Sequence, residues 1–158
     1  MSYKDLANLD LSAWNAPEPT DDLRVELTDW YRYQRHEFQR KLRDLTPEQL
    51  AAFSVEPVQL SVLGLVRHMT QMEEGYVGWG LLGGTNPMRY GEEDYAGGTV
   101  DSLDDDLEIY FEAVGAADHA IASIDSLDTP GAGNGRPLRW VLLKMIDEYA
   151  IHAGQAHM

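Results

Sequence analysis

The end of the sequence contains a glutamate and a histidine four residues apart, Glu148 and His152. Residues at this spacing lie above one another on one helix face, so a carboxylate and an imidazole can bind one metal ion from the same side. Val141 and Met145 share that face, which directs the pair toward the interior. Because an unpaired buried polar group is costly, the pair needs a partner. That partner is a metal ion, a hydrogen bond between the two side chains, or a cation from a neighbouring helix.

A second histidine changes the balance between these interpretations. His68 lies between Leu65 and Met72 in an earlier helical pattern, so it also points inward. A single inward histidine is usually a satisfied core residue. Together with Glu148 and His152, however, His68 completes a set of three nitrogen and oxygen ligands. Three protein ligands with open positions are typical of a catalytic rather than a structural metal site.

The other histidines are weaker candidates. His36 stands among charged residues of the first predicted helix and is expected to be a partly exposed surface residue, although the neighbouring Arg32 and Arg35 could meet an anionic ligand. His119 is expected in solvent. His157 lies off the face that Glu148 and His152 share, and it is not counted as a ligand.

Composition limits the classes of function. The chain has 158 residues, a length that suits a single domain, and no cysteine, which excludes disulfides and thiolate metal clusters. Its 12 lysines and arginines against 27 acidic residues give a net charge of −15. This charge argues against a nucleic-acid partner and against an anionic membrane surface. The lack of cysteine favours the cytoplasm, and because no targeting segment and no apolar run that could span a bilayer is visible, a soluble chain is expected.

Helical periodicity runs through most of the sequence, and no segment alternates with the period of a strand. The pattern predicts an all-α four-helix bundle that positions the candidate ligands. Residues 1–20 are expected to be a leader that packs on the bundle, a short helical turn is expected after Thr46, and an irregular loop over 85–100 is a natural place for a binding segment. The four long helices are expected at 21–45, 59–82, 99–124 and 138–158.

Two stretches resemble a known family. The segment from Leu60 to Met69, followed by Glu73 and Trp79, resembles the second helix of the DinB-like superfamily, and the segment from Asp147 to Gln155 resembles its C-terminal metal motif. The resemblance extends over about 21–157, and it is nearest to a branch related to the mycothiol-dependent maleylpyruvate isomerases.

This resemblance implies that His68, Glu148 and His152 bind a divalent metal, zinc or nickel. A glutamate at position 148 looks like the isomerase branch, since many DinB-like proteins have histidine there. The sequence departs from that branch at Gln155, where the branch often has histidine. It also ends at Met158, where relatives usually continue by a turn or more.

Two classes of function follow from the resemblance. In the first, the protein is a metal-dependent S-transferase or isomerase that presents a small thiol such as mycothiol to an electrophile, and a metal-dependent hydrolase with the same ligands is a variant. In the second, it is a metal- or ligand-binding module without turnover. The acidic chain suits a near-neutral thiol better than an anionic one. A homodimer is compatible with either class. Substrate or cofactor contacts are expected from Met72, Trp79, Arg89 and Gln155.

Overall fold

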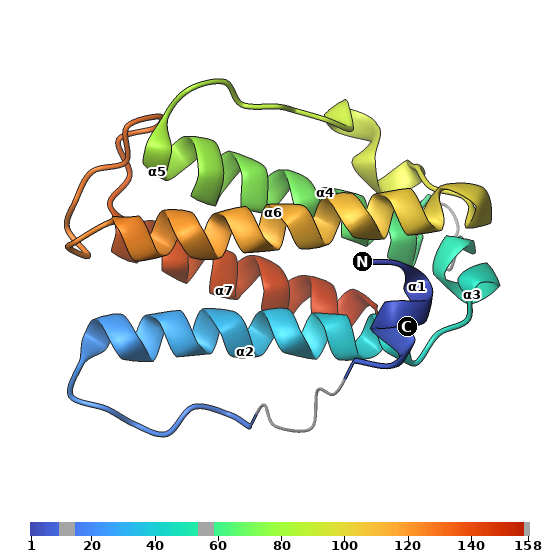
Figure 1. Ribbon diagram of the computed structural model, residues 1–158, viewed down its shortest axis with the longest axis horizontal. Helices are drawn as coiled ribbons and strands as arrows, with labels where there is room; N and C mark the ends of the chain where they lie inside the picture. The colour runs from blue at the N-terminus through green and yellow to red at the C-terminus, as the bar shows by residue number, and fades with distance from the viewer. Residues whose placement is uncertain (10–14, 54–58, 157–158) are drawn as a thin grey trace.

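The computed structural model describes residues 1–9, 15–53 and 59–156, and these fold into an all-α bundle of four long helices (Figure 1). This confirms the predicted fold class. One of the four long helices, which we call rods, is composite, because α4 continues through a π-helix, η1, into α5. The rods are α2 (Leu23–Arg43), α4 (Val62–Met72) with η1 (Glu73–Trp79) and α5 (Gly80–Leu82), α6 (Leu103–Ser123) and α7 (Leu138–Gln155).

Short elements close the ends of the bundle. Helix α1 (Tyr3–Ala7) begins the chain, with Leu6 fully buried and the hydroxyl of Tyr3 donating to the carbonyl oxygen of Leu45 at 2.8 Å. The remaining short elements are the helix α3 (Pro47–Ala51) and two 3₁₀ turns, η2 (Gly91–Ala96) and η3 (Val100–Ser102). Part of the predicted leader, residues 10–14, lies outside the described residues.

Side-chain caps explain where the helices begin. The carboxylate of Asp22 accepts the backbone N–H groups of Arg24 and Val25, so α2 begins after Asp22 rather than after Thr20 or Asp21 as expected. Ser61 caps α4 by accepting the N–H of Gly64 at 2.9 Å. Each cap satisfies donors that the first helical turn leaves without an intrahelical partner.

The π-helix is the largest local departure from the expected pattern. The sequence predicts one regular helix up to Leu82, whereas Glu73–Trp79 form wider turns. π segments are rare and occur mostly as insertions within α-helices, often at functional sites. The rod ends where predicted, because Gly83 adopts a φ of +78° that glycine tolerates and other residues rarely adopt.

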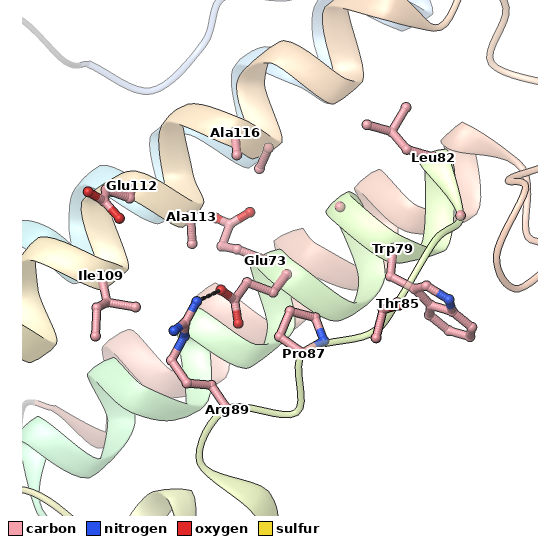
Figure 2. A pocket seen from close by; sticks show the side chains of 14 residues that line it. Glu73, Trp79, Leu82, Thr85, Pro87, Arg89, Ile109, Glu112, Ala113 and Ala116 are labelled. Carbon is pink, nitrogen blue, oxygen red and sulfur yellow. Dashed lines mark hydrogen bonds and ion pairs between the residues drawn. The ribbon is translucent and has the colours of Figure 1, made fainter.

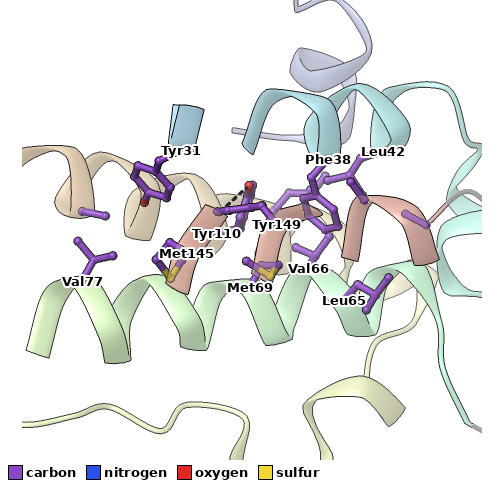
Figure 3. Close-up of a cluster of buried hydrophobic side chains, with 14 of the residues drawn as sticks. Tyr31, Phe38, Leu42, Leu65, Val66, Met69, Val77, Tyr110, Met145 and Tyr149 are labelled. Carbon is purple, nitrogen blue, oxygen red and sulfur yellow. Dashed lines mark hydrogen bonds between the residues drawn. The ribbon is translucent and has the colours of Figure 1, made fainter. Parts of the chain in front are cut away.

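The core lies along the axis of the bundle and combines aromatic with aliphatic side chains (Figure 3). Phe38 of α2 packs between two tyrosines, with ring centroids 6.2 Å from Tyr110 of α6 and 5.8 Å from Tyr149 of α7. Such tilted and edge-to-face pairs add stabilisation to the burial of the rings themselves. No helix in the described part of the chain is long and apolar enough to cross a membrane. The cytoplasmic location and the homodimer remain predictions.

The loop that connects α5 with α6 folds back along α4, where Figure 1 shows it above the green helix. Its η2 turn touches α4 so closely that a Cβ at Gly64 would lie 2.0 Å from the carbonyl oxygen of Tyr95. Gly64 therefore permits a contact that no larger residue allows without movement. This contact holds Asp94 and Tyr95 over the middle of α4.

Candidate metal centre

The structure brings together the three residues that the sequence selected as metal ligands. His68 of α4 faces Glu148 and His152 of α7, and one ligand atom from each lies within 4.8 Å of the others. Oε2 of Glu148 is 3.6 Å from Nε2 of His68 and 3.2 Å from Nε2 of His152. All three side chains are largely shielded from solvent, with exposed fractions of 12%, 13% and 7% in chain order.

These distances fit a tetrahedral ion. Nitrogen and carboxylate ligands lie about 2.1 Å from zinc, so two ligands at the tetrahedral angle lie about 3.4 Å from each other. The two distances at Glu148, 3.2 and 3.6 Å, fall on either side of that value. The helices thus hold Glu148 and each of the two histidines at a spacing that one small divalent ion can bridge.

Each histidine is oriented by an acceptor at its other nitrogen. Asp94 Oδ2 lies 2.8 Å from Nδ1 of His68, and Gln155 Oε1 lies 2.6 Å from Nδ1 of His152. Because both oxygens accept hydrogen bonds, each Nδ1 carries the proton, and in the neutral ring the lone pair is on Nε2. Acceptors at the second ring nitrogen are the usual partners of histidines that bind metals. Gln155, predicted as a contact residue, therefore lies behind His152.

A positive charge between the ligand atoms would stabilise this arrangement. Nε2 of His152 lies 3.2 Å from Oε2 of Glu148, and a neutral ring with its proton on Nδ1 would face that oxygen with a second acceptor. Such a contact is favourable when a cation lies between the atoms or when the imidazole is protonated. A divalent ion satisfies all three ligands at once.

Glu148 is held in its ionised form. Hydrogen bonds with His152 and His68 keep the pKa of Glu148 well below its ordinary value, and Lys144 adds to this effect from 2.5 Å away at the other carboxylate oxygen. The carboxylate thus keeps Oε1 for Lys144 and offers Oε2 to the centre. The contact between the Lys144 ammonium and Oε1 explains how Glu148 can remain charged although it is mostly buried.

Tyr95 from the η2 turn covers this centre. Its ring stacks on His68 with centroids 4.3 Å apart, and its hydroxyl lies 2.9 Å from Nε2 of His68. Burial, together with the charges of Asp94 and Glu148, raises the pKa of Tyr95 to about 12. The phenol therefore keeps its proton, and its hydroxyl lies beside the point where the three side chains meet.

The remaining predicted contact residues lie further along the α4–η1 rod. Met72 and Trp79 line a cavity of about 260 Å³ that begins one helical turn beyond His68. Arg89 lies instead at a second cavity, of about 360 Å³, between η1 and α6, where its guanidinium donates to Glu74 at 2.8 Å (Figure 2). Arg89 is thus bound to a carboxylate and does not reach the three ligands.

The structure places two of the other histidines on the long helices. His119 is exposed and His36 is partly buried on α2, away from the centre. His157 lies outside the described residues. Arg35, named with Arg32 as a residue that could meet an anionic ligand, is buried, and it pairs with Glu73 and Asp118 within the protein.

A known protein family matches most of the chain. The family model described as mycothiol-S-transferase matches residues 26–158. The chain belongs to the mycothiol-S-transferase family. This membership confirms the DinB-like resemblance and its mycothiol-related branch. The comparisons with curated proteins and with solved structures gave no match.

This mycothiol-S-transferase family member also contains a polar network inside the core that sequence reasoning missed. The fully buried carboxylate of Glu73 accepts hydrogen bonds from Arg35 at 3.1 Å, from Tyr149 at 2.6 Å and from Tyr31. Burial raises the pKa of Glu73, and the charge of Arg35 opposes this shift. The residues come from α2, η1 and α7, so the network ties three rods together beneath the ligand-bearing face.

Asp94 and Tyr95 were missed for a different reason. Both lie in the 85–100 loop, which the sequence marks as a candidate binding segment without indicating which of its residues reach the centre. An aspartate next to a tyrosine in a loop carries no periodic signal. The presence of Gly64 on α4 could have indicated a close approach by another segment, since glycine within a helix usually has a packing or functional reason.

Proposed function

We propose that this protein is a metal-dependent thiol S-transferase, with His68, Glu148 and His152 as ligands of one zinc or nickel ion and mycothiol as the thiol. The proposal rests on one observation above all, namely that Oε2 of Glu148 lies 3.6 Å and 3.2 Å from Nε2 of His68 and of His152, with one ligand atom of each residue within 4.8 Å of the others. Membership in the mycothiol-S-transferase family supports the choice of thiol.

The ion supplies Lewis acidity, which lowers the pKa of a coordinated thiol so that the sulfur is a nucleophile at neutral pH. The protein supplies the geometry. Asp94 and Gln155 fix the ring orientation of His68 and His152, Lys144 holds the carboxylate of Glu148 in place, and three protein ligands leave room for a further one. The hydroxyl of Tyr95 is a donor for an anionic group next to the ligands.

In the proposed reaction, the thiol loses its proton to solvent and its sulfur forms a bond to an electrophilic carbon. The bond between that carbon and its leaving group breaks, and the leaving group departs with the electron pair. If the electrophile is an unsaturated acid, the sulfur instead adds to the double bond and is later expelled, which gives an isomerisation. Both outcomes use the same thiol and the same ligands.

The net charge of −15 bears on the choice of thiol. A strongly acidic protein repels an anionic cofactor at long range, whereas a near-neutral thiol meets no such barrier. Mycothiol is near-neutral and glutathione is anionic. We therefore expect turnover with mycothiol to exceed turnover with glutathione.

The test begins with the metal content of purified wild-type protein, His152→Ala and His119→Ala. The expected result is about one zinc or nickel ion per chain in the wild type and in the exposed-histidine control, and loss of the ion in His152→Ala with helicity unchanged by circular dichroism. Conjugation of mycothiol to an alkyl halide is then followed for the same three proteins.

Each outcome separates the alternatives. The metal site is overturned if the wild type, purified without chelator, contains neither zinc nor nickel and takes up neither ion when it is added. Metal binding without thiol conjugation favours a binding module or, if an ester is hydrolysed instead, a metal-dependent hydrolase. Equal conjugation by wild type and His152→Ala overturns the role of the ligands.

A further inference from the structure

A second feature lies beside the metal centre, the 260 Å³ cavity introduced above. Four of its walls are large apolar or aromatic side chains from the α4–η1 rod and from the loop that follows it. Two of its walls are neutral amides from the loops after α5 and before α7. These six residues are Met72, Tyr76, Trp79, Met88, Asn86 and Asn134.

The cavity is joined to the ligands through one side chain. Gln71, which also lines the cavity, donates from Nε2 to Asp94 Oδ2 at 2.8 Å, and the same oxygen of Asp94 holds His68. Met72 follows His68 by four residues on the same rod, so the two lie one turn apart on one face. The cavity therefore begins one helical turn from His68 and shares with it the hydrogen-bonded carboxylate of Asp94.

The backbone fixes the orientation of both asparagine amides. Oδ1 of Asn134 accepts the N–H of Arg136 at 2.9 Å, and Oδ1 of Asn86 accepts the N–H of Met88 at 3.4 Å. An amide whose oxygen is used in this way presents its NH₂ group to other partners. Both NH₂ groups lie against glycines of the rod, within 4 Å of where a Cβ of Gly75 or Gly80 would be. The cavity thus offers two hydrogen-bond donors.

The chemistry of the walls restricts the occupant. Among the described residues, none that lines this cavity carries a charge, so an ionised molecule would lose its hydration without gaining a counter-charge. The second cavity differs, because Glu73, Glu74 and Glu112 line it together with Arg89. An apolar cavity of about 150 Å³ is enough to hold benzene. The cavity of about 260 Å³ therefore has room for a substituted aromatic ring.

Met88 adds an independent sign of function. Its φ is +43°, a left-handed conformation that costs free energy in a residue with a side chain, and it is the one non-glycine residue of this kind among the described residues. Its apolar side chain is 55% exposed at the mouth of the cavity. A strained backbone that holds an apolar side chain at the rim is more easily explained by a ligand than by folding.

We propose that this cavity binds the electrophile, as a neutral aromatic molecule that carries a hydrogen-bond acceptor such as a nitro or carbonyl oxygen. The ring packs on Met72, Tyr76 and Trp79, and its acceptor faces the NH₂ groups of Asn86 and Asn134. The inference rests on the proposed function, since it places the electrophile beside the thiol, but binding to the cavity needs neither metal nor thiol.

The binding test uses two unreactive probes of nearly equal shape, 4-nitrotoluene and 4-methylbenzoate, titrated into the full chain by calorimetry. The variants are Asn86→Asp and Asn134→Asp, which keep the oxygen that accepts the backbone N–H and replace the NH₂ donor with a negative oxygen. Asn15→Asp is the matched control, because it adds the same charge at an exposed position. We expect the wild type and the control to bind 4-nitrotoluene in preference to 4-methylbenzoate, and each cavity variant to bind it roughly tenfold more weakly.

Equal affinity of the wild type for both probes, or unchanged affinity in both cavity variants, overturns the inference. His152→Ala separates this result from the fate of the proposed function. If it loses metal and turnover but still binds 4-nitrotoluene, the cavity acts as inferred. If the wild type binds the probe and never conjugates a thiol, the proposed function fails while the binding site stands.

A turnover experiment places the cavity in the reaction. 4-Nitrobenzyl chloride and 4-(chloromethyl)benzoate have the same reacting carbon, where the C–S bond forms, the C–Cl bond breaks, chloride leaves with the electron pair and the thiol proton goes to solvent. With mycothiol, we expect kcat/KM for the nitro compound to exceed that for the carboxylate, and Asn134→Asp to reduce it mainly through KM. Equal kcat/KM values for the two halides overturn the assignment of the electrophile.

Discussion

Asp94 Oδ2 lies 2.8 Å from Nδ1 of His68, although the two residues stand 26 positions apart in the chain. The contact joins a loop to a helix, because the η2 turn lies directly on α4. Asp94 is almost fully buried and also accepts a hydrogen bond from Gln71, so its carboxylate is fixed from two sides. It thereby positions His68, one of the three proposed ligands, without being a member of that set.

Asp94→Asn should weaken metal binding while the bundle stays folded. The amide keeps the shape of the carboxylate but loses its charge, which makes His68 a poorer ligand. Changes of this kind typically reduce metal affinity by about 10- to 100-fold. Competition with a chromophoric chelator measures zinc affinity, and circular dichroism checks the fold. Equal zinc affinity in Asp94→Asn and the wild type would show that the carboxylate has no such role.

Gly64→Ala tests the contact that brings this loop to the centre. Alanine normally stabilises a helix, but here its Cβ would lie 2.0 Å from the carbonyl oxygen of Tyr95 and would displace the η2 turn. We expect a loss of about 1–3 kcal/mol in the free energy of unfolding, measured with urea, and weaker zinc binding.

Gly115→Ala is the matched control for that substitution. Gly115 also lies within a long helix, α6, and nothing stands within 4 Å of its added Cβ. This change should raise the free energy of unfolding by about 0.5–1 kcal/mol and leave zinc affinity unchanged. If Gly64→Ala stabilised the protein as much as Gly115→Ala, the loop would not depend on the close approach.

The sequence predicts much of this fold because its strongest signals are local. Apolar residues three and four apart mark all four rods, and Ser61 and Thr46 cap the helices that follow them. Glu148 and His152 are identifiable for the same reason, since their spacing alone places them on one helix face. His68 needed the family resemblance as well, because a single histidine on an inward face has no unique meaning.

What could not be predicted depends on contacts between distant segments. The sequence does not indicate that Arg35 and Glu73 are buried as a pair, because their burial follows from the way α2 meets η1. The π-helix has no periodic signature of its own, because seven residues are too few to distinguish its wider turns from an α-helix. Asp94 reaches His68 through loop geometry, which propensity and spacing do not encode.

Glu73→Ala should be among the most destabilising substitutions in the protein. It leaves the guanidinium of Arg35 buried beside an empty space and removes the acceptor of the Tyr149 hydroxyl. Breaking a buried ion pair from one side typically costs about 3–5 kcal/mol. Urea denaturation measures this loss. Asp44→Ala serves as the control, because the pair of Asp44 with Arg43 is exposed and should contribute less than about 1 kcal/mol. Equal losses in the two variants would contradict a structural role for the buried network.

The lowered pKa of His36 predicts how the free energy of unfolding depends on pH. Burial, with the nearby Arg35 and Arg40 adding to it, lowers the pKa of His36 from 6.5 to about 4, while Asp118 opposes the shift. As the pH falls below 6.5, the imidazole therefore takes up a proton in the unfolded chain before it does so in the folded one. Protonation favours unfolding, so this contribution to stability is complete above 6.5 and is lost as the pH falls toward 4.

The test compares urea denaturation of the wild type and His36→Gln between pH 4 and pH 7. Acidic residues also titrate in this range, but they are present in both proteins, so the difference between the two curves isolates the histidine. The wild type should lose more free energy of unfolding than the variant as the pH falls from 6.5 to 4. Parallel curves would mean that His36 is no harder to protonate in the folded protein, and a steeper loss in the variant would reverse the sign of the shift. His119→Gln, which removes an exposed histidine from α6, shows what loss of an imidazole does away from the packed face of α2.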